Sequence, residues 1–150
     1  MGQLCRRSRR AIVPIPAKLQ EQLDDLAIFT DRQDRIEALI ALADDYKHPS
    51  ATDFVRSEDK KVPGCESEVF IEAVPGGGSV EYHFAVDNPQ GISAMAMAVL
   101  LQAASGAPKD EIAAIEEGIV FEVFGNELSM GKNLGLTNMV KIVKRLSALS

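Results

Sequence analysis

The sequence predicts an α+β fold in which a small antiparallel sheet packs against helices. Two stretches in the middle of the chain alternate in the manner of strands, and stretches with helical periodicity lie on both sides of them. At 150 residues, with no internal repeat and no interior linker, the chain has the length of one domain with one core. We therefore expect a single domain over residues 17–150, preceded by a basic, flexible tail over residues 1–16.

Two helices are expected before the strands. Residues 17–29 carry leucines at near-helical spacing, and Pro14 and Pro16 mark where this helix can begin. Residues 30–33 read TDRQ, which has the form of a capping box, and predict a second helix that ends near Tyr46. The apolar residues expected on one face of this second helix are Ile36, Leu39, Ile40 and Ala43.

A long loop and a hairpin are expected next. Residues 51–64 are polar and irregular, and a loop of this length inside a domain is usually functional or disordered. The alternating runs at residues 69–74 and 80–86 flank a Pro-Gly-Gly-Gly-Ser turn, as the strands of a hairpin do.

The remainder of the chain predicts mainly helix. Asn88 followed by Pro89 is a favourable helix start, and residues 92–104 are apolar almost all round, as in a buried central helix. Residues 108–116 predict a short surface helix, and residues 132–148 predict an amphipathic last helix. Residues 118–125 fit either a strand or two helical turns, so periodicity leaves them open.

Charge and cysteine content narrow the possible functions. The formal net charge is −6. The tail at Arg6–Arg10 is basic and contains no acidic residue, so the folded part is more acidic than the whole chain. An acidic body disfavours nucleic acid as a partner. No apolar run could span a membrane, and Cys5 and Cys65 do not form a disulfide framework, which favours an intracellular setting. The cysteines and histidines lack the close pairs of a metal site.

Cys65 is the candidate functional residue. It follows a Pro-Gly turn at the end of the long loop, immediately before the first strand, where a scaffold can hold a reactive thiol. The alternatives are an inert buried cysteine and the nucleophile of a Cys–His hydrolase with His83 as its base.

Residues 62–70, VPGCESEVF, resemble the signature of the SufE family, which reads V-x-G-C-x-S-x-V-aromatic. Further landmarks in the family's order are Asp87, an apolar helix through Leu101, Leu128-Ser129 and Gly135-Leu136. The resemblance covers roughly residues 17–147.

The resemblance implies a sulfur carrier of iron–sulfur cluster assembly with a sandwich fold similar to that of IscU-type scaffolds. Cys65 would receive a persulfide sulfur from a SufS-like cysteine desulfurase, whose pyridoxal phosphate (PLP) stays on that partner, and pass it to a SufBCD-like scaffold. Gly64, Ser67, Asp87 and Lys132 would support the site. This chain itself would bind no cofactor or metal.

Further expectations follow from the same resemblance. Residues 118–125 should be helical, Lys132 should replace the family's usual arginine, and Glu68 should raise the pKa of the thiol. A carrier thiol needs protection from oxidation, so Cys65 should be partly covered at rest and exposed on docking. We expect a monomer or weak homodimer in the cytoplasm or an organelle stroma. The alternative function is a regulatory or scaffold-like binding module that carries no sulfur.

Overall fold

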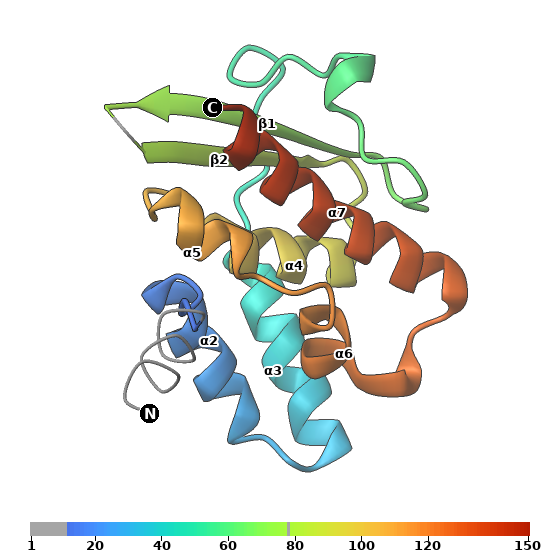
Figure 1. Cartoon of the computed structure of the whole chain (residues 1–150). Helices are drawn as coiled ribbons and strands as arrows, with labels where there is room; N and C mark the ends of the chain where they lie inside the picture. The colour runs from blue at the N-terminus through green and yellow to red at the C-terminus, as the bar shows by residue number, and fades with distance from the viewer. Residues whose placement is uncertain (1–11, 78) are drawn as a thin grey trace, which may run out of the picture.

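The computed structural model describes residues 12–77 and 79–150, so Cys5 and Arg6–Arg10 lie outside the described residues. Residues 12–16 are irregular, and Ile15 packs against the core. The elements are listed here in chain order: α2 (Ala17–Ala27), α3 (Arg32–Asp44), η1 (Glu58–Lys60), β1 (Val69–Gly76), β2 (Ser79–Val86), α4 (Ile92–Gln102), α5 (Lys109–Ala113), α6 (Ile119–Phe124), η2 (Gly125–Glu127) and α7 (Met130–Leu149) (Figure 1). A hairpin that packs on helices confirms the predicted α+β fold.

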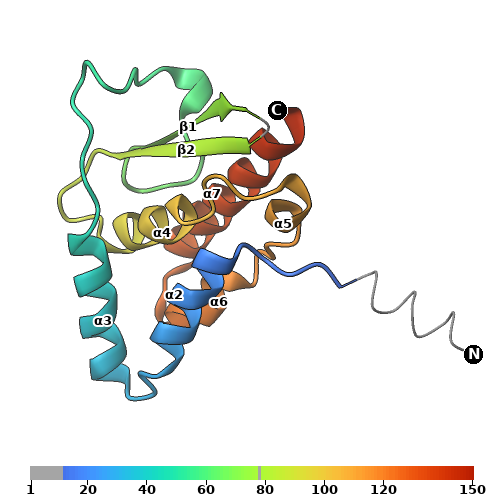
Figure 2. The same ribbon diagram turned by 90° about the vertical axis from the view of Figure 1, so that its left-hand side faces the viewer.

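The hairpin forms one layer, and α4 and α7 lie beneath it (Figures 1 and 2). β1 and β2 pair antiparallel, from Val69 opposite Val86 to Gly76 opposite Ser79. Because side chains alternate across a strand, one face of the hairpin supplies buried residues to the main core, whereas Phe70 and Ala85 point to the other face. There they pack with Phe54 from the long loop, which therefore covers the outer face of the hairpin.

The helix α4 occupies the centre of the core, as its apolar sequence predicted. Its fully covered residues include Ala96, Met97, Leu100 and Leu101. The helix α7 lies beside it and contributes Leu136, Met139, Val140 and Val143. The segment that periodicity left open is the helix α6, and its buried residues Ile119, Val120 and Val123 share one helical face.

Two predicted helix starts are wrong in detail. The cap of α3 is Asp31 and not Thr30, because its carboxylate accepts hydrogen bonds from the backbone N–H groups of Gln33 and Asp34. The residue before α4 is Gly91, and Asn88 instead forms a tight turn in which its side chain accepts from the N–H of Gln90. This turn forms one side of the candidate site.

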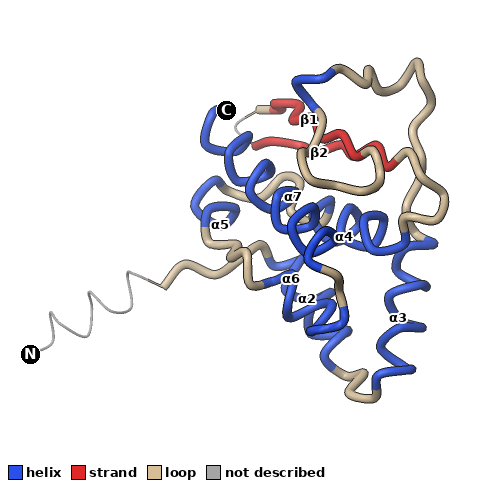
Figure 3. Tube along the Cα trace, turned by 90° about the vertical axis from the view of Figure 1, so that its right-hand side faces the viewer, coloured by secondary structure: helices blue, strands red, loops and turns tan. Residues whose placement is uncertain are grey.

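The predicted burial of one face of α3 is only partly confirmed. Ala43 is buried and Leu39 is half-buried, but Ile36 and Ile40 keep 39% and 43% of their surface exposed. The reason is the position of α3 at the edge of the helical layer, where α4 is its main neighbour (Figures 2 and 3). Part of its apolar face therefore remains open.

Candidate functional site

Cys65 lies in a short loop whose two ends are joined by backbone hydrogen bonding. The N–H of Val62 donates to the carbonyl of Val69 at 2.8 Å, and both valine side chains are buried. Lys61 and Phe70 form a bridge at the same place. The intervening residues 63–68 are thus held as a compact projection from the edge of the hairpin, with the cysteine inside it.

The helix α7 supports this loop from one side. The amide of Asn138 donates to the carbonyl of Pro63 at 2.8 Å. Gly64 has a φ of +81°, which favours glycine, and a Cβ atom there would lie 3.2 Å from the side chains of Leu134 and Asn138. A Cβ atom at Gly135 would lie 2.9 Å from both Cα and Sγ of Cys65. The backbone of α7 therefore touches the cysteine directly, which only a glycine at position 135 allows.

The turn between β2 and α4 supports the loop from the other side. The amide of Asn88 donates to Oγ of Ser67 at 3.2 Å, and the N–H of Asp87 donates to the carbonyl of Glu68 at 2.8 Å. A Cβ atom at Gly91 would lie 2.7 Å from Oγ of Ser67. Ser67 therefore positions the loop against this turn.

A cavity of about 330 Å³ opens beside the thiol. Its lining residues are Cys65, Glu66, Ser67, Asn88, the segment 90–94 at the start of α4, Lys132, Gly135 and Leu136. Lys132 lies in the first turn of α7, where its backbone N–H donates to the capping Oγ of Ser129 at 3.3 Å. Lys132 is the only cationic residue in this lining, and no described histidine contributes to it.

Burial determines the acidity of the thiol. Cys65 is half-buried, as expected for a partly covered resting thiol, and burial raises its pKa to about 11. The expectation that Glu68 raises this pKa is not supported, because the cause is burial and Glu68 lies 3.8 Å from Nζ of Lys61. At neutral pH the thiol of the free chain is therefore protonated.

Asp87 lies at the base of the site without lining the cavity. Its carboxylate binds His48 Nε2 at 2.6 Å and Arg56 Nε at 2.7 Å. Burial acts to raise its pKa, but the hydrogen bonds from Arg56 and His48 outweigh this and hold the pKa below its ordinary value. Asp87 therefore fastens the long loop to the end of β2. Sequence reasoning missed Arg56 and His48 because no local pattern links them to Asp87.

His83 does not serve Cys65. Its ring lies 3.6 Å from Glu72 and 3.9 Å from Glu81, on the face of the hairpin opposite the main core. The hydrolase alternative assigned the role of base to His83, and it is wrong in this respect because strand alternation points the ring away from the covered face.

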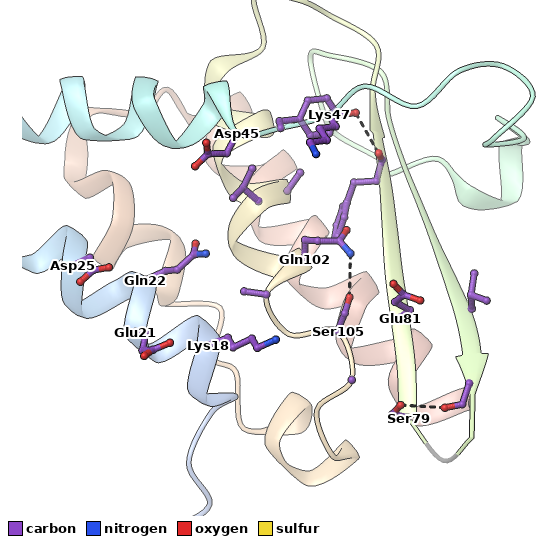
Figure 4. Close-up of a pocket in the computed structure, with 18 of the residues that line it drawn as sticks. Lys18, Glu21, Gln22, Asp25, Asp45, Lys47, Ser79, Glu81, Gln102 and Ser105 are labelled. Carbon is purple, nitrogen blue, oxygen red and sulfur yellow. Dashed lines mark hydrogen bonds between the residues drawn. The ribbon is translucent and has the colours of Figure 1, made fainter.

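A larger cavity than the one at Cys65 lies elsewhere in the described part of the chain. It has a volume of about 1150 Å³ and lies between α2, the end of α4 and the turn end of the hairpin (Figure 4). Its charged residues have both signs, with Lys18 and Lys47 beside Glu21, Asp25, Asp45 and Glu81. It contains no described cysteine or histidine, so the cavity at Cys65 remains the candidate site.

Two kinds of feature are absent from the described residues. No group of three His, Cys, Asp or Glu side chains comes together there as the ligands of a metal ion would. In the same part of the chain, no helix has both the length and the apolar character needed to cross a bilayer.

A comparison against known families matches most of the chain. The SufE model, described as an Fe-S metabolism associated domain, matches residues 20–147. The chain belongs to the SufE family. Membership links this SufE-family chain to iron–sulfur metabolism and to its assembly machinery.

One curated relative supports this assignment, and one solved structure shares the fold. The chain is 30% identical over 132 residues to an uncharacterized SufE-like protein of Rhizobium etli, a match that covers 85% of this chain and 88% of the relative. The solution structure of a hypothetical protein from Thermus thermophilus superimposes with a TM-score of 0.70 at 20% identity, covering 90% of this chain and 96% of the other. The second likeness supports the fold alone.

Proposed function

We propose that this SufE-family chain is a persulfide carrier. Cys65 accepts sulfur from a SufS-like cysteine desulfurase that holds PLP, and delivers it to a SufBCD-like scaffold, in the cytoplasm or an organelle stroma. By removing the sulfur, the chain also activates the desulfurase. The observation that carries the proposal is a thiol in a loop fixed on both sides, with a cavity beside Sγ.

The transfer step requires only one nucleophile. The thiolate of Cys65 attacks the outer sulfur of the donor persulfide, a new S–S bond forms on Cys65, and the S–S bond of the donor breaks. The donor cysteine leaves as a thiolate and takes up a proton, while Cys65 has lost one. No net oxidation occurs, and neither a metal nor a base from this chain is needed.

The surroundings of the thiol indicate where the new sulfur would lie. The backbone at Gly135 blocks the side toward α7, and the cavity of about 330 Å³ offers room for the added sulfur. Lys132 lines that cavity and would attract an anionic persulfide. A lysine provides the charge but not the planar fork of an arginine, so it acts as a point charge.

The raised pKa gives docking a role in the chemistry. A thiol with a pKa of about 11 supplies little thiolate at neutral pH, so the free chain reacts slowly. Binding of the donor must therefore change the surroundings of Sγ, either by drawing the loop away from α7 or by bringing positive charge to it. This requirement keeps sulfur transfer coupled to the correct partner.

The test is an intact-mass measurement after incubation with a cysteine desulfurase, PLP and cysteine. We expect the chain to gain about 32 Da, the mass of one sulfur, and to lose it on reduction. Cys65→Ser should abolish the gain, whereas the matched Cys5→Ser variant should retain it. If a desulfurase that binds the chain transfers no sulfur, the binding-module alternative replaces the carrier.

A further inference from the structure

An apolar groove lies next to the Cys65 cavity. It has a volume of about 210 Å³ and is walled by α3, by the start of α4 and by the segment that leads from α6 toward α7. Its apolar lining residues are Ile36, Leu39, Ile40, Ile92, Phe124 and Leu128. Ile36, Ile40 and Ile92 retain 39%, 43% and 36% of their surface exposed, so the groove is open to a partner.

The groove and the cavity of the thiol adjoin each other. Ile92 and Ser93 line both of them, so the start of α4 forms their common wall. On α7, Leu134 lies beside Gly64 of the cysteine loop, and Met130 and Leu134 are 91% and 54% exposed. Exposed apolar side chains thus lie both in the groove and on α7, which touches Cys65, and a protein that reaches the thiol must cover part of this surface.

The groove is built into the fold. Arg35, on α3, donates hydrogen bonds to the backbone carbonyls of Leu26, Glu122 and Val123. These bonds fasten α2 and α6 to α3, and they occupy the guanidinium of Arg35, which lines the groove together with Arg32. The walls thus stand in place before any partner binds, which lowers the conformational cost of binding.

We propose that the sulfur donor inserts an apolar side chain into this groove when it presents its persulfide to Cys65. The inference rests on the proposed function and adds to it the part of the surface that binds the donor. The occupant is a Leu, Ile, Met or Phe of the donor, because the lining is apolar and the groove is next to the thiol. Apolar anchors in such pockets commonly dominate the affinity of a protein interface.

The test compares Ile40→Lys with Leu149→Lys. Ile40 lines the groove, whereas Leu149 is an exposed apolar residue in the last turn of α7, outside the lining of the groove. Lysine is a good helix former and will not be buried at either position. We expect Ile40→Lys to weaken binding to a SufS-like desulfurase by about tenfold or more, and to slow sulfur transfer at limiting concentration, while Leu149→Lys behaves as native.

A second donor separates the two proposals. Inorganic polysulfide needs no docking surface, so it should persulfidate Cys65 slowly, as a thiol with a raised pKa does, and at the same rate in the native chain and in Ile40→Lys. If native Cys65 gains sulfur from neither donor, the carrier function fails. If native Cys65 gains sulfur and Ile40→Lys binds the desulfurase as tightly as native, the groove inference is overturned.

Two further measurements keep the inference testable. If Ile40→Lys does not fold, amide hydrogen exchange of the native chain tests the groove instead. Added desulfurase should slow the exchange of residues 36–40. Unchanged exchange there would refute the inference. If Ile40→Lys loses self-association but binds the desulfurase normally, the groove belongs to a second copy of the chain, which also refutes the inference.

Discussion

The thiol of Cys65 lies against the backbone of α7 at Gly135, and this contact limits its exposure and contributes to the burial that raises its pKa. The two charges that the sequence placed near the thiol do not cause this shift: Glu68 faces Lys61, and Lys132 lines the cavity beside the thiol. The reactivity of the thiol is thus controlled by how closely the loop fits the helix.

The first prediction concerns the pH dependence of alkylation at Cys65. With Cys5→Ser as background, the rate with iodoacetamide should be low at neutral pH and should rise up to about pH 11, because only the thiolate reacts and burial raises the pKa to about 11. The rate is measured by mass spectrometry across the pH range. A plateau above about pH 8.5, the value of an unperturbed cysteine, would contradict the burial argument.

The second prediction concerns Gly135→Ala. The added methyl would lie 2.9 Å from Sγ, so the loop must move away from α7, at a cost of about 1–3 kcal/mol in the free energy of unfolding. Alkylation of Cys65 should become faster as the thiol is uncovered. Gly118→Ala is the control, since a Cβ there meets nothing within 4 Å, and it should leave alkylation unchanged.

The ends of the helices and the attachments of the long loop fix the position of the cysteine loop. α3 begins at a cap and then leaves an apolar face open, and the long loop that follows it returns over the hairpin, where Phe54 is 2% exposed. The cluster of His48, Arg56 and Asp87 then attaches that loop to the end of β2, next to the turn that holds Ser67. These attachments place the cysteine loop between α7 and the start of α4.

The cap of α3 gives the third prediction. Asp31→Ala should lower the free energy of unfolding by about 1 kcal/mol, because the N–H groups of Gln33 and Asp34 lose their acceptor. Thr30→Ala should have a much smaller effect. Urea unfolding measures both, and equal losses would indicate that Thr30 shares the capping role.

The fourth prediction concerns Asp87 and pH. Its pKa in the folded chain lies below the ordinary value of 3.8, so its ion pairs stabilise the fold fully above that value, and this contribution is lost as pH falls through the folded pKa. At neutral pH, Asp87→Asn should have a lower free energy of unfolding than the native chain. Between pH 5 and about pH 2, the free energy of unfolding should fall less in Asp87→Asn than in the native chain. Asp53→Asn, in the same loop, is the control and should follow the native curve.

A single main core joins the hairpin to the helices. It contains residues from α2, both strands and α4 to α7, whereas the small cluster on the outer face of the hairpin consists of Phe54, Phe70 and Ala85. Because α4 lies at the centre of the main core, a cavity created there should lower the stability of the whole described part of the chain.

The fifth prediction tests that expectation. Leu100→Ala removes a side chain with 0% exposure and should lower the free energy of unfolding by about 3 kcal/mol, as cavity formation in a core does. Leu149→Ala, at a position with 77% exposure, should change it by less than about 0.5 kcal/mol. Both are measured by urea unfolding, and a small loss for Leu100→Ala would show that the core relaxes around the cavity.

Local patterns were enough to predict much of this molecule. The hairpin, the central helix and the last helix follow from periods of two and 3.6 residues, and the motif around Cys65 indicated the family. These features depend on neighbouring residues in the chain, so a sequence read alone can reveal them.

The remaining features depend on which elements meet in space. Periodicity could not decide that α6 is a helix, because its buried face is defined by packing against the rest of the fold. It also could not show that Ile36 and Ile40 stay exposed, or that Asp87 pairs with Arg56. The raised pKa of Cys65 could not be predicted from the sequence either, because Gly135, which touches the thiol, is distant in the sequence. Burial and electrostatics arise from such non-local contacts, and only the tertiary structure decides them.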